Sequence, residues 1–152
     1  MAKVFKNGSC LNKYEVRNTK YVIPSININL YKLFMQDLKQ RTFNYAVTVG
    51  KLILDLPYST VNKEYFRQLV RCSSSVGANY RAARRAKSDA DFINKLKIVE
   101  EESDESVYFL ELLREFNASF KDRITELIFE GTEILKIIVS SINTTRARIN
   151  SK

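Results

Sequence analysis

The chain has 152 residues, a hydrophobic content of 45% and a formal net charge of +8 at pH 7. This length supports one hydrophobic core but not two ordinary domains, and a total of four Gly and two Pro argues against a turn-rich sheet protein. Because the chain has no His and no apolar run long enough to cross a membrane, we expect an all-α cytoplasmic protein without a metal site, a cofactor or a membrane anchor.

The sequence predicts three regions that differ in structure. Residues 1–30 show no sustained hydrophobic period and are rich in Asn and Lys, so we expect a poorly ordered basic arm there. Residues 31–147 carry the periodicity of a helical bundle, and residues 148–152 form a short basic tail.

The first helix is expected from Tyr31 to Leu56, where Pro57 ends it. One side of this helix carries residues at the 4-3-4-3-4 spacing of a buried seam. These positions are Leu38, Thr42, Tyr45, Val49, Leu52 and Leu56.

The second helix is expected to begin near Asn62 and to have two faces. Cations occupy one face of this helix, and further cations follow its C-terminal end. Residues 57–87 together contain seven Lys or Arg and one acidic residue. The opposite, apolar face is formed by Phe66, Leu69, Ser73, Val76, Tyr80 and Ala83. Because Tyr80 lies at the centre of that face, we interpret it as a core residue rather than as a base-stacking residue.

The third helix begins with a capping box, in which Ser88 is followed by Asp91, and it is acidic where the second helix is basic. Its buried seam is predicted at Phe92, Leu96, Val99, Ser103, Ser106, Leu110 and Leu113. A second stripe lies beside this seam, which suggests that one face of the helix serves another subunit. We therefore predict a subunit interface at Ile98, Glu102, Glu105 and Phe109.

The fourth helix is expected to open with a second capping box, formed by Ser119 and Asp122. Its inward positions are Ile124, Leu127 or Ile128, Gly131, Ile134 or Leu135, Ile138 and Ile142. Four long helices joined by short links predict an antiparallel up-down-up-down four-helix bundle.

Residues from the second and third helices resemble a known family. The resemblance covers about residues 35–142 and is strongest over 68–113. The residues that carry it are Gln68, Arg71, Ser75, Ala78, Asn79, Ser88, Asp91, Phe92, Leu96, Glu102, Ser103, Glu105, Ser106 and Leu110. The pattern is similar to the bacterial four-helix-bundle proteins known as the 23S rRNA intervening-sequence or S23 ribosomal protein family.

This resemblance implies a left-handed four-helix protomer that assembles into a homo-oligomeric ring, a pentamer in the family. A related branch, the accessory variability protein of diversity-generating retroelements, is a basic ring that binds nucleic acid and a reverse transcriptase. A reverse transcriptase is therefore an implied protein partner. The chain departs from the commoner family motif at Ala82 and Ala83, where the family has an acidic residue and Gly. A site that needed that carboxylate would be missing here.

The cations of the second helix are the candidate binding residues for nucleic acid, RNA or DNA. Arg offers planar, bidentate donors for phosphate oxygens, and Lys adds a point charge. The set comprises Lys63, Arg67, Arg71, Arg81, Arg84, Arg85 and Lys87. The alternative interpretation is a solvated or salt-bridged helix face, because charge runs on helices are usually of that kind.

The remaining polar residues favour structural roles, and no catalytic residue is predicted. We expect Glu102 and Glu105 to pair with arginines of the second helix, either between chains or between helices, and Asn79 to bond to backbone. With no His, and with Cys10 and Cys72 far apart and lacking a ligand cluster, neither nucleophilic catalysis nor metal binding is favoured.

The sequence thus predicts a non-enzymatic, ring-forming bundle that binds nucleic acid without sequence preference, as an accessory factor to a nucleic-acid enzyme. The alternative is an oligomeric scaffold without nucleic-acid binding, whose arginines are used in subunit contacts.

Overall fold

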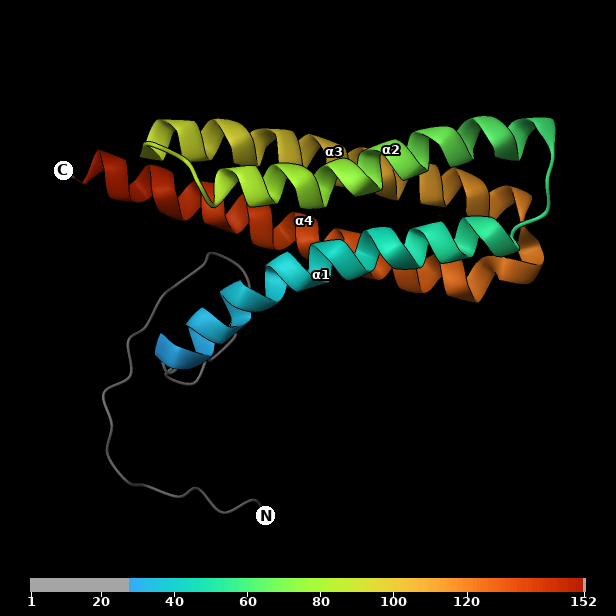
Figure 1. Cartoon of the computed structure of the whole chain (residues 1–152), viewed down its shortest axis with the longest axis horizontal. Coiled ribbons are helices and arrows are strands. Elements are labelled where there is room, and N and C mark those ends of the chain that lie inside the picture. The colour runs from blue at the N-terminus through green and yellow to red at the C-terminus, as the bar shows by residue number, and fades with distance from the viewer. Residues whose placement is uncertain (1–27, 152) are drawn as a thin grey trace, which may run out of the picture. The chain divides into compact units, whose positions relative to one another are not determined.

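The computed structural model describes the backbone of residues 28–151 and the side chains of residues 38–151. Within this range the chain is helical and contains no strand, which confirms the predicted all-α class (Figure 1). Most of the expected basic arm, residues 1–27, lies outside the described residues. The elements are α1 (Ile28–Asp55), α2 (Thr60–Ala83), α3 (Asp89–Phe116), the 3-10 turn η1 (Ala118–Phe120) and α4 (Lys121–Asn150).

The chain divides into two compact units, residues 1–36 and residues 37–152, and the bundle is the second unit. The two outer helix ends differ from the sequence-based expectation. Helix α1 begins at Ile28 rather than Tyr31. Helix α4 continues to Asn150, so Arg148 is helical rather than part of a tail.

The core is formed by the seams that the sequence spacing predicted. All six predicted seam positions of α1 are buried, including the polar Thr42. In α3 the seam is buried from Leu96 to Leu113, while Phe92 at its start is half-buried against the core. In α4 the spacing left two choices open, and the structure buries Leu127 and Ile134 more deeply than their neighbours.

Two polar groups in the core bring α1, α3 and α4 together. The Tyr45 hydroxyl lies 2.8 Å from Ser106 Oγ, and Ser106 donates its own proton to the Ser103 carbonyl, so Tyr45 is the donor to Ser106. Gly131 of α4 faces the same point, because a Cβ there would lie 2.7 Å from Tyr45 Oη and 2.9 Å from Val107 Cγ2. The absence of a side chain at Gly131 is therefore what admits the Tyr45 ring.

A buried amide pair holds the end of the bundle at which α2 begins and α3 ends. Asn62 donates to Asn117 Oδ1 at 2.9 Å and to the Pro57 carbonyl, while Asn117 donates to Asn62 Oδ1 at 3.2 Å and to the Leu113 carbonyl. Both side chains are nearly inaccessible to solvent, so this pairing satisfies groups that would be costly to bury alone. We call it the amide pair.

The predicted capping box at the start of α4 is wrong. The 3-10 turn Ala118–Phe120 follows α3, and α4 begins at Lys121 after Phe120, with no side-chain cap. The physical reason is that Asn117 is committed to the amide pair, so the chain tightens directly after it. The Ser88 cap of α3 is confirmed by the hydrogen bond from the Asp91 amide to Ser88 Oγ, at 3.1 Å.

The two ends of the bundle carry different links between helices (Figure 1). The α1–α2 and α3–α4 connections lie at one end, with the amide pair. At the other end, residues 84–88 link α2 to α3 beside the C-terminal end of α4. The candidate site lies at this second end.

Candidate functional site

All seven cations that the sequence singled out are exposed, four of them on α2 and three on the link that follows it, and α2 buries most of its opposite face. Leu69, Ser73 and Val76 are almost fully buried, as is Tyr80, which confirms Tyr80 as a core residue. Phe66 is half-buried. Asn79 donates to the Ser75 carbonyl at 3.0 Å, the structural role expected for it.

Carboxylates neutralise the middle of this basic face. Arg71 donates from Nη1 to Glu102, at 3.3 Å from Oε1, and from Nη2 to Glu105 on α3. The Glu105 hydrogen bond is the main cause that raises the pKa of Arg71, and the charge of Glu102 adds to it. The predicted pairing of Glu102 and Glu105 with an α2 arginine is therefore confirmed, between helices of one chain. Arg67 pairs with Glu64, one turn earlier on the exposed surface, at 3.0 Å.

The last turn of α2 and the link after it are different, because three of their cations are not held in ion pairs. Among the residues that the structure describes, Arg81, Arg85 and Lys87 form no ion pair, and the Arg84 side chain is exposed beside them. Lys63 also forms no ion pair with a described residue, but it lies near the start of α2, about 30 Å away along the helix. The predicted row is thus divided by Arg67 and Arg71.

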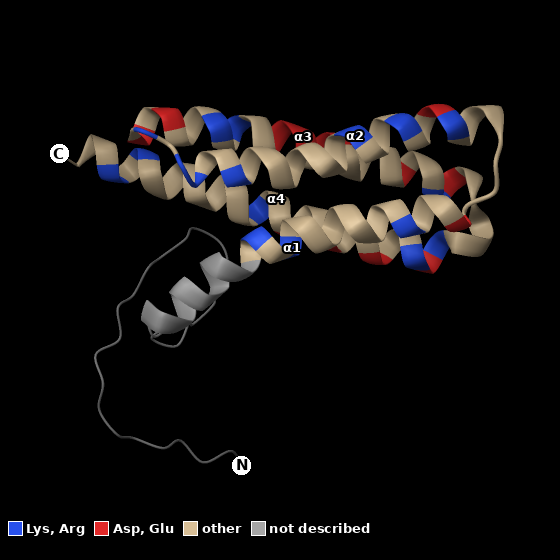
Figure 2. Cartoon of the chain, in the orientation of Figure 1, with Lys and Arg blue, Asp and Glu red and all other residues tan. Residues whose placement is uncertain are grey.

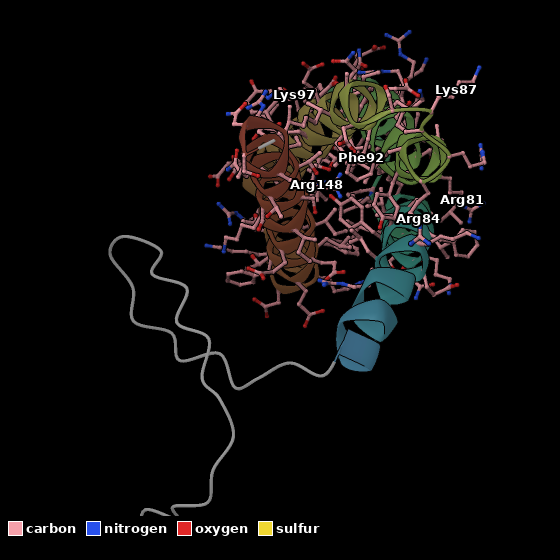
Figure 3. The ribbon with its side chains drawn as sticks, turned by 90° about the vertical axis from the view of Figure 1, so that its left-hand side faces the viewer. Arg81, Arg84, Lys87, Phe92, Lys97 and Arg148 are labelled. Carbon is pink, nitrogen blue, oxygen red and sulfur yellow. The ribbon has the colours of Figure 1, made fainter. Side chains whose placement is uncertain are left out.

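Helix α4 adds cations at the same end. Arg146 and Arg148 are exposed near its C-terminus, and Figure 2 shows Lys and Arg on the end of α4 and on the α2–α3 link. Viewed onto this end in Figure 3, Arg81, Arg84 and Lys87 lie on one side, Lys97 and Arg148 on the other, and Phe92 between them. We call this surface the cationic end and define it as Arg81, Arg84, Arg85, Lys87, Arg146 and Arg148.

The carboxylates closest in sequence to the cationic end neutralise one of its members and leave three others without an ion pair. Asp89 pairs with Arg148 across α3 and α4. Asp91 pairs with Lys95 and accepts the Lys87 backbone N–H, and these bonds lower the pKa of Asp91. Lys87 bonds to Asp91 through its backbone N–H, and its ammonium charge adds a smaller effect on that carboxyl without an ion pair. The positive charge of Arg81, Arg85 and Lys87 is left facing solvent.

One aromatic side chain at this end was not predicted. Phe43 of α1 is 48% exposed, and the Arg81 guanidinium carbon lies 5.8 Å from the centroid of its ring. Phe43 is not one of the buried seam positions of α1, so the periodicity of the sequence predicts only that it faces solvent. The contact with Arg81 depends on how α1 packs on α2, which a single-helix pattern does not contain. The sequence shows Arg146 and Arg148 as cations, but it does not show that they lie at the same end of the bundle as the cations that follow α2.

The residues predicted at a subunit interface lie on the outer side of α3. Ile98 is 42% exposed, whereas Glu102, Glu105 and Phe109 are half-buried. Phe109 contacts Tyr65 of α2 and Tyr108, with ring centroids 6.1 Å and 5.5 Å away. Three of the four predicted residues thus have partners within the chain, and their role between subunits stays a prediction.

The described residues offer little reactive chemistry elsewhere. Cys72 is fully buried, and desolvation, followed by the charge of Glu105, raises the pKa of its thiol to about 12. Burial also raises the pKa of Tyr45. Over residues 38–151, no three His, Cys, Asp or Glu side chains come together as metal ligands. None of the helices described is both long and apolar enough to cross a membrane.

Comparisons with known proteins agree with the architecture. The family model described as 23S rRNA-intervening sequence protein matches residues 36–140. A crystal structure of a protein of unknown function from the S23 ribosomal protein family of Bacteroides thetaiotaomicron VPI-5482 is 35% identical, with a TM-score of 0.61. The match covers 69% of this chain and 97% of that one. No curated protein matches the chain.

Proposed function

The chain belongs to the 23S rRNA-intervening sequence protein family, and we propose that it is a non-enzymatic protein that binds nucleic acid, RNA or DNA, through its cationic end. Binding by such a surface follows from charge and shape, because Arg and Lys neutralise phosphates and release the counterions around them. It requires no base-specific contact.

The observation that carries this proposal is the exposed charge of Arg81, Arg85 and Lys87, none of which is held in an ion pair with a described residue. The α3 helix beside them is acidic, but its Asp91 acts on the Lys87 side chain only through its charge. Arg81 lies in the last turn of α2, and Arg85 follows four residues later in the link to α3. Planar guanidinium groups at that spacing suit the oxygens of successive phosphates.

The proposal includes the finer architecture implied by the family resemblance. We propose a left-handed antiparallel bundle that assembles into a homo-oligomeric ring and serves as an accessory factor to a nucleic-acid enzyme. In such a ring each protomer contributes one cationic end, and several weak phosphate contacts then act together on one strand.

A second candidate is an oligomeric scaffold that does not bind nucleic acid. The engagement of Arg71 with Glu102 and Glu105 favours it, since it shows that part of the basic face serves contacts between helices. This argument applies to the middle of α2 and does not extend to Arg81, Arg85 and Lys87.

Charge reversal at the cationic end tests the proposal. The triple variant Arg81→Glu, Arg85→Glu, Lys87→Glu should lose affinity for a generic oligonucleotide, and the remaining binding should depend less steeply on salt. Each lost phosphate contact lowers the slope of log affinity against log salt by about 0.9 on duplex DNA and about 0.7 on single strands. Titration by fluorescence anisotropy over a salt series measures both quantities.

A matched control reverses three exposed lysines at the opposite end of the bundle, Lys51→Glu, Lys63→Glu and Lys121→Glu. The net charge change is the same, so this variant should keep most of the affinity. Equal losses in the two variants would show that binding is not localised at the cationic end. Failure of the wild type to retain an oligonucleotide at low salt, with a change in molar mass in the first variant, would favour the scaffold.

A further inference from the structure

Phe43 and Arg81 form an exposed pair at the cationic end. Almost half of the Phe43 side chain is accessible to solvent, at 48%, while the Arg81 guanidinium lies over its ring at 5.8 Å from the centroid. A cation–π contact at such an exposed site holds the arginine near the ring but does not require the ring to be open to solvent. The free surface of Phe43 is therefore not explained by its contact with Arg81.

The position of this pair is fixed by the packing of α1 on α2. Thr42, the residue before Phe43, is buried in the core. A Cβ built at Gly77 would lie 3.5 Å from the Thr42 carbonyl oxygen, so the two helices approach closely at this point. Phe43 is therefore presented from α1 next to the last turn of α2, which carries Arg81, and Arg85 lies in the link that follows.

We infer that the cationic end takes single-stranded nucleic acid, with one unpaired base stacking on Phe43 and the adjoining phosphates at Arg81 and Arg85. This inference rests on the proposed function and narrows its ligand. A duplex stacks its bases on each other and offers only their edges and the backbone, whereas a single strand offers the faces of its bases. An aromatic ring among cations is the combination that sites for single strands use.

A second exposed phenylalanine on the same molecule provides a comparison. Phe129 of α4 is 67% exposed, and its neighbours one turn away on the same face include Glu126 and Glu133, of which Glu133 pairs with Lys136. Among the described residues, no cation lies over the ring of Phe129. Phe129 is thus more exposed than Phe43 but has no cation over its ring, and it serves as the matched control.

The test compares Phe43→Leu, Phe43→Trp and Phe129→Leu, each as the full chain. Leucine keeps apolar bulk but removes the aromatic face, and tryptophan keeps that face. Affinity is measured by anisotropy for a labelled oligothymidylate of 12 nucleotides and for a DNA duplex of 12 base pairs, at one salt concentration. Circular dichroism checks that each variant retains the helical content of the wild type.

We expect Phe43→Leu to weaken binding of the oligothymidylate by about 5- to 100-fold and to leave duplex binding within about twofold. Phe43→Trp should retain the wild-type affinity, and Phe129→Leu should leave the affinity for both ligands unchanged. Unchanged oligothymidylate binding by Phe43→Leu, or an equal loss for the duplex, overturns the inference while the proposed function stands. Absence of oligonucleotide binding by the wild type at low salt overturns both.

Discussion

Two buried tyrosines differ in whether their hydroxyl groups have a partner. Tyr45 donates to Ser106, whereas the Tyr80 hydroxyl has no hydrogen-bond partner among the described residues. Both side chains are only 2% exposed. The first hydroxyl replaces its lost hydration with a hydrogen bond, and the second does not.

Removing each hydroxyl should therefore have different effects. Tyr45→Phe should lower the free energy of unfolding by about 0.5–1.5 kcal/mol, because the hydrogen bond to Ser106 is lost. Tyr80→Phe should leave it unchanged or raise it by up to about 1 kcal/mol, because a desolvated hydroxyl is removed. Urea titration followed by circular dichroism measures both values, and a loss in Tyr80→Phe equal to that in Tyr45→Phe would contradict the assignment.

At single positions, the sequence was most informative where a residue lies on a helical face. Tyr80 could be assigned to the core from the residues around it on α2. The amide pair of Asn62 and Asn117 could not be predicted, because the two residues are far apart in sequence and each resembles an ordinary turn residue. Their partnership exists only after two helix ends meet.

The helices themselves show how one residue type can have opposite roles. Gly131 lies where α4 meets Tyr45 and Val107, so an added Cβ would clash. Around Gly50 of α1 there is nothing within 4 Å of the position that a Cβ would occupy. The first glycine is required by packing, and the second only weakens its helix.

Substitution of each glycine by alanine should separate these roles. Gly131→Ala should lower the free energy of unfolding by about 1–3 kcal/mol through overpacking. Gly50→Ala should raise it by up to about 1 kcal/mol through helix propensity. Thermal and urea unfolding measure both effects. In a Tyr45→Phe background the loss from Gly131→Ala should shrink, because the nearest clashing atom is gone; additive losses would count against the contact.

The presence of each helix and its buried face could be predicted, because the spacing of buried residues along one helix can be read from that segment of the sequence alone. The start of α4 was not, since Ser119 and Asp122 fit the capping pattern while Asn117 is held by a residue of α2. The basic face of α2 shows the same limit. The sequence predicted which side of α2 carries the cations. It did not predict that Arg71, in the middle of that face, is neutralised, because this depends on where α3 places Glu102 and Glu105.

Charge is unevenly distributed over the bundle as a whole. Cations from α2, the α2–α3 link and α4 gather at the cationic end (Figure 2), where they repel one another at low ionic strength. An anion that binds this surface relieves the repulsion in the folded protein. Unfolding disperses the same charges, so the anion stabilises the folded state by linkage.

Low-millimolar sulfate should therefore raise the thermal midpoint of the wild type more than chloride at equal ionic strength. The variant Arg81→Gln, Arg85→Gln, Lys87→Gln should lose most of this difference, because only the general salt effect remains. Differential scanning fluorimetry provides the comparison. Equal responses of the two proteins to sulfate would show that these cations do not form an anion site.

The C-terminal end of α4 lies beside the link between α2 and α3, and this has a practical consequence for engineered versions of the protein. An acidic epitope fused there would act as a tethered competitor, at an effective concentration in the millimolar range for a short linker. A polyhistidine fusion would instead contribute cations of its own below neutral pH. Affinities obtained from such fusions would describe the appended peptide as much as the bundle, so removing it before titration is part of any fair measurement.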